Sequence, residues 1–267
     1  MTQTTTTAPC SVIIRNRNEM QHLKSVLRAL QVQDTPHEVI VVDNCSDDGS
    51  VALAQSLGAR VVPVRDFSYG RALNIGMAEA ANEVCVILSA HSLPMGPHFL
   101  SACQDALRNP SVAGARCVYA GKGSDTLRWL DPERLVGSES PDHASKGVLA
   151  SGCVIRRSTW CSIPFNEHVR AAEDKLWSEA VLRAGWEIVS PAPAFYSYLQ
   201  PVSALAEARK NYVELQELHK YTGATVGLAA TPYPALFRSV VTAPMQGGIP
   251  ATRLSLLRLW LRYRFPR

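Results

Sequence analysis

Residues able to bind or transfer charged groups occur at four places in this chain of 267 residues. Arg15–Asn18 and Asp43 each follow an apolar run, Ser89–His91 follows a later one, and Glu173 and Asp174 precede a helical pattern. Arginine and asparagine side chains can donate hydrogen bonds to bases and phosphates, and aspartate can accept them from base N–H groups and ribose hydroxyls. A carboxylate can also take a proton from a hydroxyl. The pattern therefore predicts a polar site assembled from distant segments.

The intervening sequence alternates between strand and helix patterns. Apolar, β-branched runs predict strands at 11–14, 39–42, 61–64 and 85–88, and amphipathic spacing predicts helices at 19–31, 51–57 and 70–81. This alternation predicts an α/β fold with a doubly wound, mostly parallel sheet. Ligands of such sheets bind beyond the carboxyl ends of the strands, which is where Arg15–Asn18, Asp43 and Ser89–His91 fall.

The same strand ends exclude two classes of nucleotide-binding protein. Neither G-x-G-x-x-G nor a Walker sequence follows any of the strands, which argues against dinucleotide dehydrogenases and P-loop NTPases. A nucleotidyltransferase would need a glycine-rich loop after the first strand, and Arg15–Glu19 contains no glycine. Asp43 ends a strand and suits ligand contact, whereas Asp47 and Ser50 suit helix capping.

Taken in order, the motifs from residue 10 to about 198 resemble inverting family-2 glycosyltransferases of the GT-A fold, and most of all the bacterial rhamnosyltransferase-like members. The segments that carry the resemblance are IRNRNE (14–19), VVDNCSDDGS (41–50), GRALNIG (70–76), ILSAHSLP (87–94), PFNE (164–167), AEDKLWS (172–178) and AGW (184–186). The resemblance implies transfer of a sugar from a UDP-, GDP- or dTDP-sugar to a hydroxyl of a glycan or lipid-linked glycan, as in polysaccharide biosynthesis.

The resemblance also implies roles for residues of the nucleotide-binding half. Asp43 would contact the base, Arg15 and Asn18 would line the nucleotide pocket, and Arg71 would approach the diphosphate. For Arg71 a second interpretation stays open, a solvated residue in the first turn of a helix, although an anion at that position is favoured by the helix dipole.

By the same resemblance Asp174 would be the general base, with Glu173 beside it to fix the loop or the acceptor. Two acids in the first turn of a helix are also explained by the helix dipole alone. Trp177 and Trp129 are candidate acceptor-binding residues, and Trp129 could instead anchor its loop.

The chain departs from the family pattern where these enzymes usually carry Asp-x-Asp for Mg²⁺ or Mn²⁺ on the donor diphosphate. Ser89, Ala90 and His91 stand there, so both carboxylates are missing. His91 could ligate a metal, with Mn²⁺ preferred over Mg²⁺, or as an imidazolium it could bond a phosphate oxygen directly. We favour a divalent metal, because a departing diphosphate needs strong charge stabilisation.

We divide the chain into a flexible tail at 1–9, a glycosyltransferase domain at 10–200 and a basic helical extension at 201–267. Within the domain, 10–118 would bind the nucleotide and 119–200 the acceptor, with a mobile loop at about 119–150. A returning strand with a polar turn follows at 148–157, and the extension begins with a helix at about 203–221.

Composition and charge bear on localisation. No secretory signal or membrane-spanning stretch is evident, and seven cysteines without C-x-x-C predict buried thiols in the cytoplasm. Residues 218–267 hold seven basic and no acidic residues, and 251–267 alternates arginines with leucines and aromatics. This segment could bind an anionic membrane at its inner face or simply dock on the domain. No nucleic-acid partner is expected, since no stacking platform or recognised motif accompanies the charge.

One rival function remains from the sequence. A non-catalytic protein that binds nucleotide sugars or glycans would explain Ser89–His91 as a decayed metal site. Retention of Glu173 and Asp174 favours an enzyme instead.

Overall fold

The computed structural model describes residues 8–120, 133–137 and 146–200, and beyond these 213, 214, 217, 220 and 221. The strands are β1 Cys10–Asn16, β2 His37–Asp43, β3 Arg60–Pro63, β4 Val84–Ser89, β5 Ser92–Pro94, β6 Val112–Tyr119, β7 Glu133–Val136, β8 Gly152–Arg156 and β9 Glu187–Tyr198. The helices with described bounds are α1 Met20–Gln31, α2 Ser50–Ser56, α3 Tyr69–Glu79, α4 Phe99–Ala106, α7 Arg157–Ser162 and α8 Glu173–Arg183.

The strands form one sheet in the order β3-β2-β1-β4-β8-β6-β9-β5, and β7 pairs with β9. Neighbours are parallel from β3 through β4, β8 runs antiparallel between β4 and β6, and β9 is again parallel to β6. The carboxyl ends of β1, β2, β4, β6 and β9 therefore lie along one edge of the sheet, together with the start of β8. We call this the carboxyl edge. The predicted doubly wound, mostly parallel α/β fold is confirmed.

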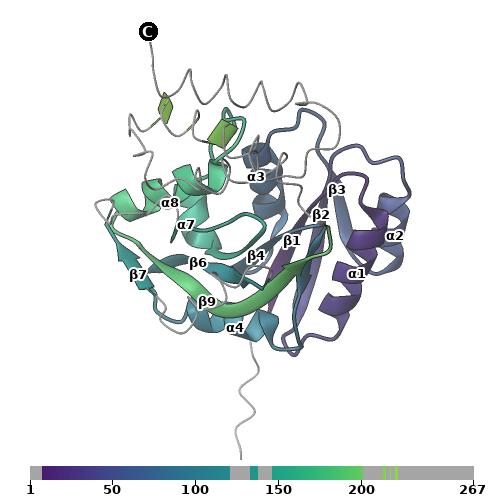
Figure 1. The fold of residues 1–267 in the computed structure, drawn as a ribbon, viewed down its shortest axis with the longest axis horizontal. Coiled ribbons are helices and arrows are strands. Elements are labelled where there is room, and N and C mark those ends of the chain that lie inside the picture. Colours follow the sequence, from purple (N-terminus) through teal and green to yellow (C-terminus); the bar gives the residue numbers. More distant parts are fainter. Residues whose placement is uncertain are drawn as a thin grey trace, which may run out of the picture.

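Helices cover both faces of the sheet, because successive strand residues point to opposite sides. Val12 and Ile14 pack on one face in a core with residues of α1, α2 and α4, whereas Ile13 packs on the other with residues of α3 and α8. Figure 1 shows the latter two helices on the far side of the sheet from α4. The apolar runs of the strands are continuous because both faces are buried.

The predicted strands and helices of the first half are all present, each within a few residues of its predicted bounds. Two predictions in the second half were wrong. The structure has a strand, β7, inside the segment predicted as a loop at 119–150, and the polar turn expected after β8 is the helix α7. The described part of the predicted helix at 203–221 is helical, and the rest of that prediction lies outside the described residues.

Gly70, in the first turn of α3, explains how closely this helix approaches the loop before α8. A Cβ atom at this position would lie 2.2 Å from the carbonyl oxygen of Asn166, which is backbone and cannot give way cheaply. The side chain of Asn74 then fastens the helix to the loop, donating to Phe165 O at 2.9 Å and to Glu167 Oε1 at 2.8 Å. These contacts set the loop that leads into α8.

None of the helices that the structure describes is long and apolar enough to cross a bilayer. All seven cysteines are free, and five of them are buried, as predicted, while Cys45 and Cys161 are exposed. Burial raises the pKa of both Cys10 and Cys85 to about 12, so these thiols stay protonated and act as small apolar groups.

Candidate active site

The ends of β1 and β2 are joined by a hydrogen-bonded turn centred on Asp43. Asn16 pairs with Asp43 in the strand register and donates from Nδ2 to its Oδ2 at 2.8 Å. The Ser46 hydroxyl and backbone N–H donate to the same carboxylate at 2.7 and 2.8 Å. Asp43 is only 3% exposed, so its described contacts hold the turn, and contact with a base stays a prediction.

Asn18 closes this turn from the side of β1. Its φ of 51° is left-handed, a conformation that asparagine tolerates better than most residues. Its backbone N–H donates to Ser46 Oγ at 2.9 Å, and its side-chain Oδ1 accepts from the Asp47 N–H at 2.9 Å. Asn18 therefore lies at the carboxyl edge as predicted, and its amide oxygen shapes the loop.

Asp48 caps two helices at once. Its carboxylate accepts the Met20 N–H at the start of α1 at 2.8 Å and the Ser50 N–H at the start of α2 at 3.0 Å. Partial burial would raise the pKa of this carboxyl, but hydrogen bonds from Ser50 and Met20 outweigh it and hold the pKa below its usual value. Asp48 thus holds the starts of α1 and α2 together, close to the ends of β1 and β2.

Arg15 connects the end of β1 to the start of α8. Its guanidinium pairs with Glu173 Oε1 at 3.1 Å, donates to Ala150 O at 3.1 Å and lies 5.2 Å from the ring centroid of Tyr69. Both charged side chains are largely buried, with 14% and 7% exposed. The sequence predicted Arg15 for the nucleotide pocket and Glu173 for fixing the loop or the acceptor, and the contacts found are those of a structural link.

Asp174 lies next to this link, in the first turn of α8. Its Oδ2 accepts the Ala150 N–H at 2.9 Å, and its Oδ1 accepts the Lys175 N–H at 2.8 Å. Because a carboxylate offers about four acceptor positions, these two bonds orient the group and leave it able to accept a proton. Asp174 as a whole is only partly buried.

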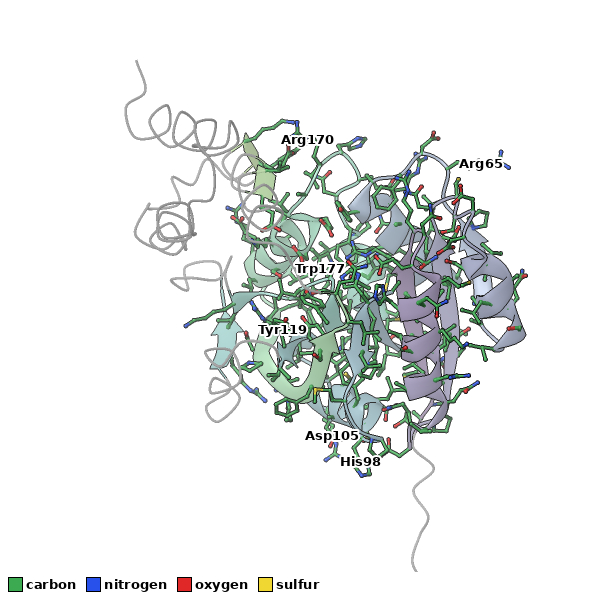
Figure 2. All side chains as sticks on the ribbon, turned by 45° about the vertical axis from the view of Figure 1, so that its right-hand side comes forward. Arg65, His98, Asp105, Tyr119, Arg170 and Trp177 are labelled. Carbon is green, nitrogen blue, oxygen red and sulfur yellow. The ribbon has the colours of Figure 1, made fainter. Side chains whose placement is uncertain are left out.

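The prediction that Trp177 binds the acceptor does not fit its position. Trp177 is 2% exposed, its indole N–H donates to Ile163 O at 2.7 Å, and its ring packs on Phe165. Figure 2 shows it among the side chains of the interior. Helical spacing cannot tell which face of a short helix is buried, and here Trp177 faces the core. Trp129 lies outside the described residues.

Arg71 lies beside a pocket of about 390 Å³ at the start of α3, which is lined by Asp66, Phe67, Ser68, Arg71, Glu167 and His168. Two carboxylates flank its guanidinium, Asp66 Oδ2 and Glu167 Oε2, each at 3.7 Å. Ser68 caps the helix by accepting the Arg71 N–H at 3.2 Å. Contact between Arg71 and a diphosphate stays a prediction, and an incoming phosphate would compete with these acids.

His91 follows β4 at the carboxyl edge, as predicted, and pairs with Glu19, for which the sequence pattern predicted no role. Nδ1 of the imidazole lies 2.9 and 3.1 Å from the two oxygens of the Glu19 carboxylate. No group of three histidine, cysteine or acidic side chains that could hold a metal ion exists among the residues described.

Tyrosines at the ends of β6 and β9 complete the edge. Tyr198 donates to Ser151 Oγ at 2.8 Å, and the rings of Tyr119 and Tyr198 lie 4.5 Å apart. Tyr196 is fully buried beside them, and burial raises its pKa well above the usual value. Alternation in FYSY at 195–198 places Tyr196 and Tyr198 on one face, a signal that could have been read from the sequence.

The sheet order and the polar carboxyl edge define a GT-A-type α/β protein. A family model described as glycosyl transferase family 2 matches residues 11–159, more than half of the chain, and the chain belongs to that family. Membership of the rhamnosyltransferase-like subset stays a prediction.

Solved structures with the same fold are only distantly similar in sequence. One is a mannosyltransferase from Pyrobaculum calidifontis in complex with GDP-Man and Mn²⁺, at 19% identity and a TM-score of 0.65 over 95% of this chain and 80% of that one. Another is S. aureus TarS residues 1–349 with UDP-GlcNAc, at 17% identity and TM-score 0.58, covering 87% and 80%. A third is the glucosyl-3-phosphoglycerate synthase of Mycobacterium tuberculosis with Mn²⁺, UDP and glucosyl-3-phosphoglycerate, at 18% identity and TM-score 0.59, covering 82% of each chain.

Proposed function

We propose that this glycosyltransferase moves a sugar from a nucleotide-sugar donor to a hydroxyl of a glycan or lipid-linked glycan by direct, inverting displacement, with Asp174 as the general base. The observation that carries the proposal is the fixed orientation of Asp174 by the Ala150 N–H at 2.9 Å, beside the Arg15–Glu173 link to β1. The base is thereby attached to the edge of the sheet at which family-2 enzymes are expected to hold their donor.

Two features of this arrangement suit proton abstraction. The acceptor hydroxyl must lose its proton as the bond from the anomeric carbon to the diphosphate breaks, and a partly exposed carboxylate can take it. Glu173 acts through Arg15 and the loop at Ala150, so its role is to position Asp174. No covalent intermediate is needed, because one displacement inverts the anomeric centre.

The donor class rests on likeness to proteins crystallised with GDP-Man, UDP-GlcNAc and UDP. Two of those structures hold Mn²⁺, which supports the expectation of a divalent ion in the family. The residues here do not form a matching protein-held site, since the described part of the chain brings no three ligating side chains together. We therefore assign no step of the reaction to a metal.

The first prediction tests the base. Asp174→Asn keeps the size of the side chain but removes its basicity, so kcat should fall by about 10²-fold or more while donor affinity is retained. Transfer assays with a panel of UDP-, GDP- and dTDP-sugars, together with calorimetry of donor binding, measure both quantities. The matched control is Asp105→Asn, an exposed carboxylate at the lower end of the molecule in Figure 2, away from Trp177 of α8, and this change should leave turnover unchanged.

Full turnover in the Asp174→Asn variant would show that the base assignment is wrong. The anomeric configuration of the product, read by NMR, tests inversion separately. A wild-type protein that binds a donor but neither transfers nor hydrolyses it would instead support the rival function, a non-catalytic binding protein.

A further inference from the structure

The imidazole of His91 is held in one orientation by its neighbours. Glu19 contacts Nδ1 with both carboxylate oxygens, at 2.9 and 3.1 Å, and because a carboxylate only accepts, Nδ1 must carry hydrogen. The ring packs edge-on against Tyr198, with 5.3 Å between centroids, and the backbone of His91 accepts the Leu199 N–H at 2.9 Å. The Glu19 carboxylate and the Tyr198 ring therefore orient the imidazole, and the backbone hydrogen bond fixes the main chain that carries it.

The other ring nitrogen, Nε2, is the ring atom available to a ligand. Among the described residues none hydrogen-bonds to Nε2, and 27% of the side chain is exposed. It lies after β4 at the carboxyl edge, the place at which the family usually carries its carboxylates. A phosphate group of a donor bound at this edge can therefore reach it.

The donor set at this place does not suit a hard divalent ion. Mg²⁺ and Mn²⁺ favour oxygen ligands. Both oxygens of Glu19 are directed at Nδ1 of His91, and Ser89 is only 9% exposed. Among the described residues, this place offers a single imidazole, and no group of three potential ligands is assembled there.

We propose that Glu19 and His91 form a dyad that binds the diphosphate of the donor directly, in place of a metal held by the protein. As the imidazolium, His91 donates from both nitrogens, Nδ1–H to Glu19 and Nε2–H to a phosphate oxygen. Glu19 is a positioning residue that compensates the charge of the ring and fixes its direction. The dyad then stabilises the negative charge that develops on the departing diphosphate.

The inference rests on the proposed function, so the experiment first establishes that the protein binds a nucleoside diphosphate, the part of the donor that the dyad would contact. Calorimetry of the wild-type protein with UDP, GDP and dTDP is run once in EDTA and once with MnCl₂. We expect at least one diphosphate to bind in EDTA. His91→Ala should weaken that binding about tenfold or more, because a hydrogen bond to a charged group usually contributes that much. The affinity for the matching nucleoside, which lacks the diphosphate, should change little.

Variants of Glu19 separate positioning from a purely structural role. Glu19→Gln and Glu19→Ala should weaken diphosphate binding less than His91→Ala, and neither should weaken it further in the His91→Ala background. His22→Ala tests the other histidine near Glu19, at 3.6 Å, and should have no effect. His98→Ala is a matched control, because His98 pairs with Asp34 at 2.6 Å beyond the end of α1, whereas Glu19 precedes the start of that helix. Figure 2 shows His98 at the lower end of the molecule.

The outcomes distinguish the inference from the function beneath it. If the wild type binds no nucleoside diphosphate under either condition, the proposed function itself fails. If binding requires Mn²⁺, if His91→Ala leaves it unchanged, or if Glu19→Ala weakens it equally without His91, the dyad is overturned while the glycosyltransferase proposal stands.

Discussion

The Asp43 carboxylate accepts three hydrogen bonds inside the turn that follows β2, from Asn16 Nδ2 and from the backbone and side chain of Ser46. Asp43→Asn places an amide N–H₂ against these donors and leaves some of them unpaired. We expect the free energy of unfolding to fall by about 1–3 kcal/mol, measured by urea denaturation. Donor affinity should fall as well, because the turn also holds Asn18 at the carboxyl edge.

The control for this substitution is Asp47→Asn in the same turn. The described hydrogen bond of Asp47 comes from its backbone N–H, so loss of its carboxylate should leave stability unchanged. If Asp43→Asn is as stable as the wild type but binds the donor weakly, the carboxylate serves the ligand and not the turn.

Single residues also show where sequence reasoning reaches its limit. Asp43, Asn18 and His91 were placed correctly at the carboxyl edge, because strand ends can be read from apolar runs. Glu19 was missed, since its partner lies 72 positions away and no local pattern joins them. Trp177 was assigned to the wrong surroundings because only the folded chain shows which side of α8 is buried.

At the scale of elements, Asp48 serves two helices with one carboxylate, so Asp48→Ala should destabilise the fold by about 1 kcal/mol at neutral pH. Its pKa is lowered in the folded protein, so its contribution is present above the unfolded pKa of about 4 and is lost as the pH falls below it. The difference in stability between variant and wild type should therefore shrink below about pH 4. Urea denaturation across pH 3–7 measures it, and a constant difference would contradict the capping role.

The elements up to β4 were predictable because each strand there is an apolar run bounded by polar turns, whereas β5, α4 and β6 were not predicted. The second half was less predictable. β7 has four residues and α7 has six, too few for a periodic pattern, and β8 enters antiparallel between two parallel strands, which no local signal indicates.

At the scale of the whole molecule, ion pairs attach Glu214 and Glu217, two described residues beyond residue 200, to the segment that carries the proposed base, Asp174. Lys175 Nζ pairs with Glu214 Oε2, and Arg170 Nε lies 4.0 Å from Glu217 Oε1. Both glutamates are largely buried. The predicted boundary at residue 200 stays a proposal, and these pairs indicate that Glu214 and Glu217 support the start of α8.

A charge swap tests this support. Lys175→Glu should lower the free energy of unfolding by about 1–3 kcal/mol, because two carboxylates would then face each other in a partly buried place. Adding Glu214→Lys should restore much of the loss, and urea denaturation of the single and double variants gives the coupling. If the single and the double variant are both as stable as the wild type, the pair contributes nothing to stability.

The basic extension bears on whether the protein binds a membrane. Residues 251–267 lie outside the described residues, and their arginines and leucines still predict binding to an anionic membrane surface. Replacing Arg258, Arg262 and Arg264 by glutamine should release the protein from phosphatidylserine-containing vesicles at physiological salt, since each basic side chain contributes about 1 kcal/mol. Sedimentation with vesicles measures this, and Arg28→Gln on α1 is the control for loss of positive charge elsewhere. Wild-type protein that stays in the supernatant would exclude the membrane interpretation and leave docking on the domain as the role of the segment.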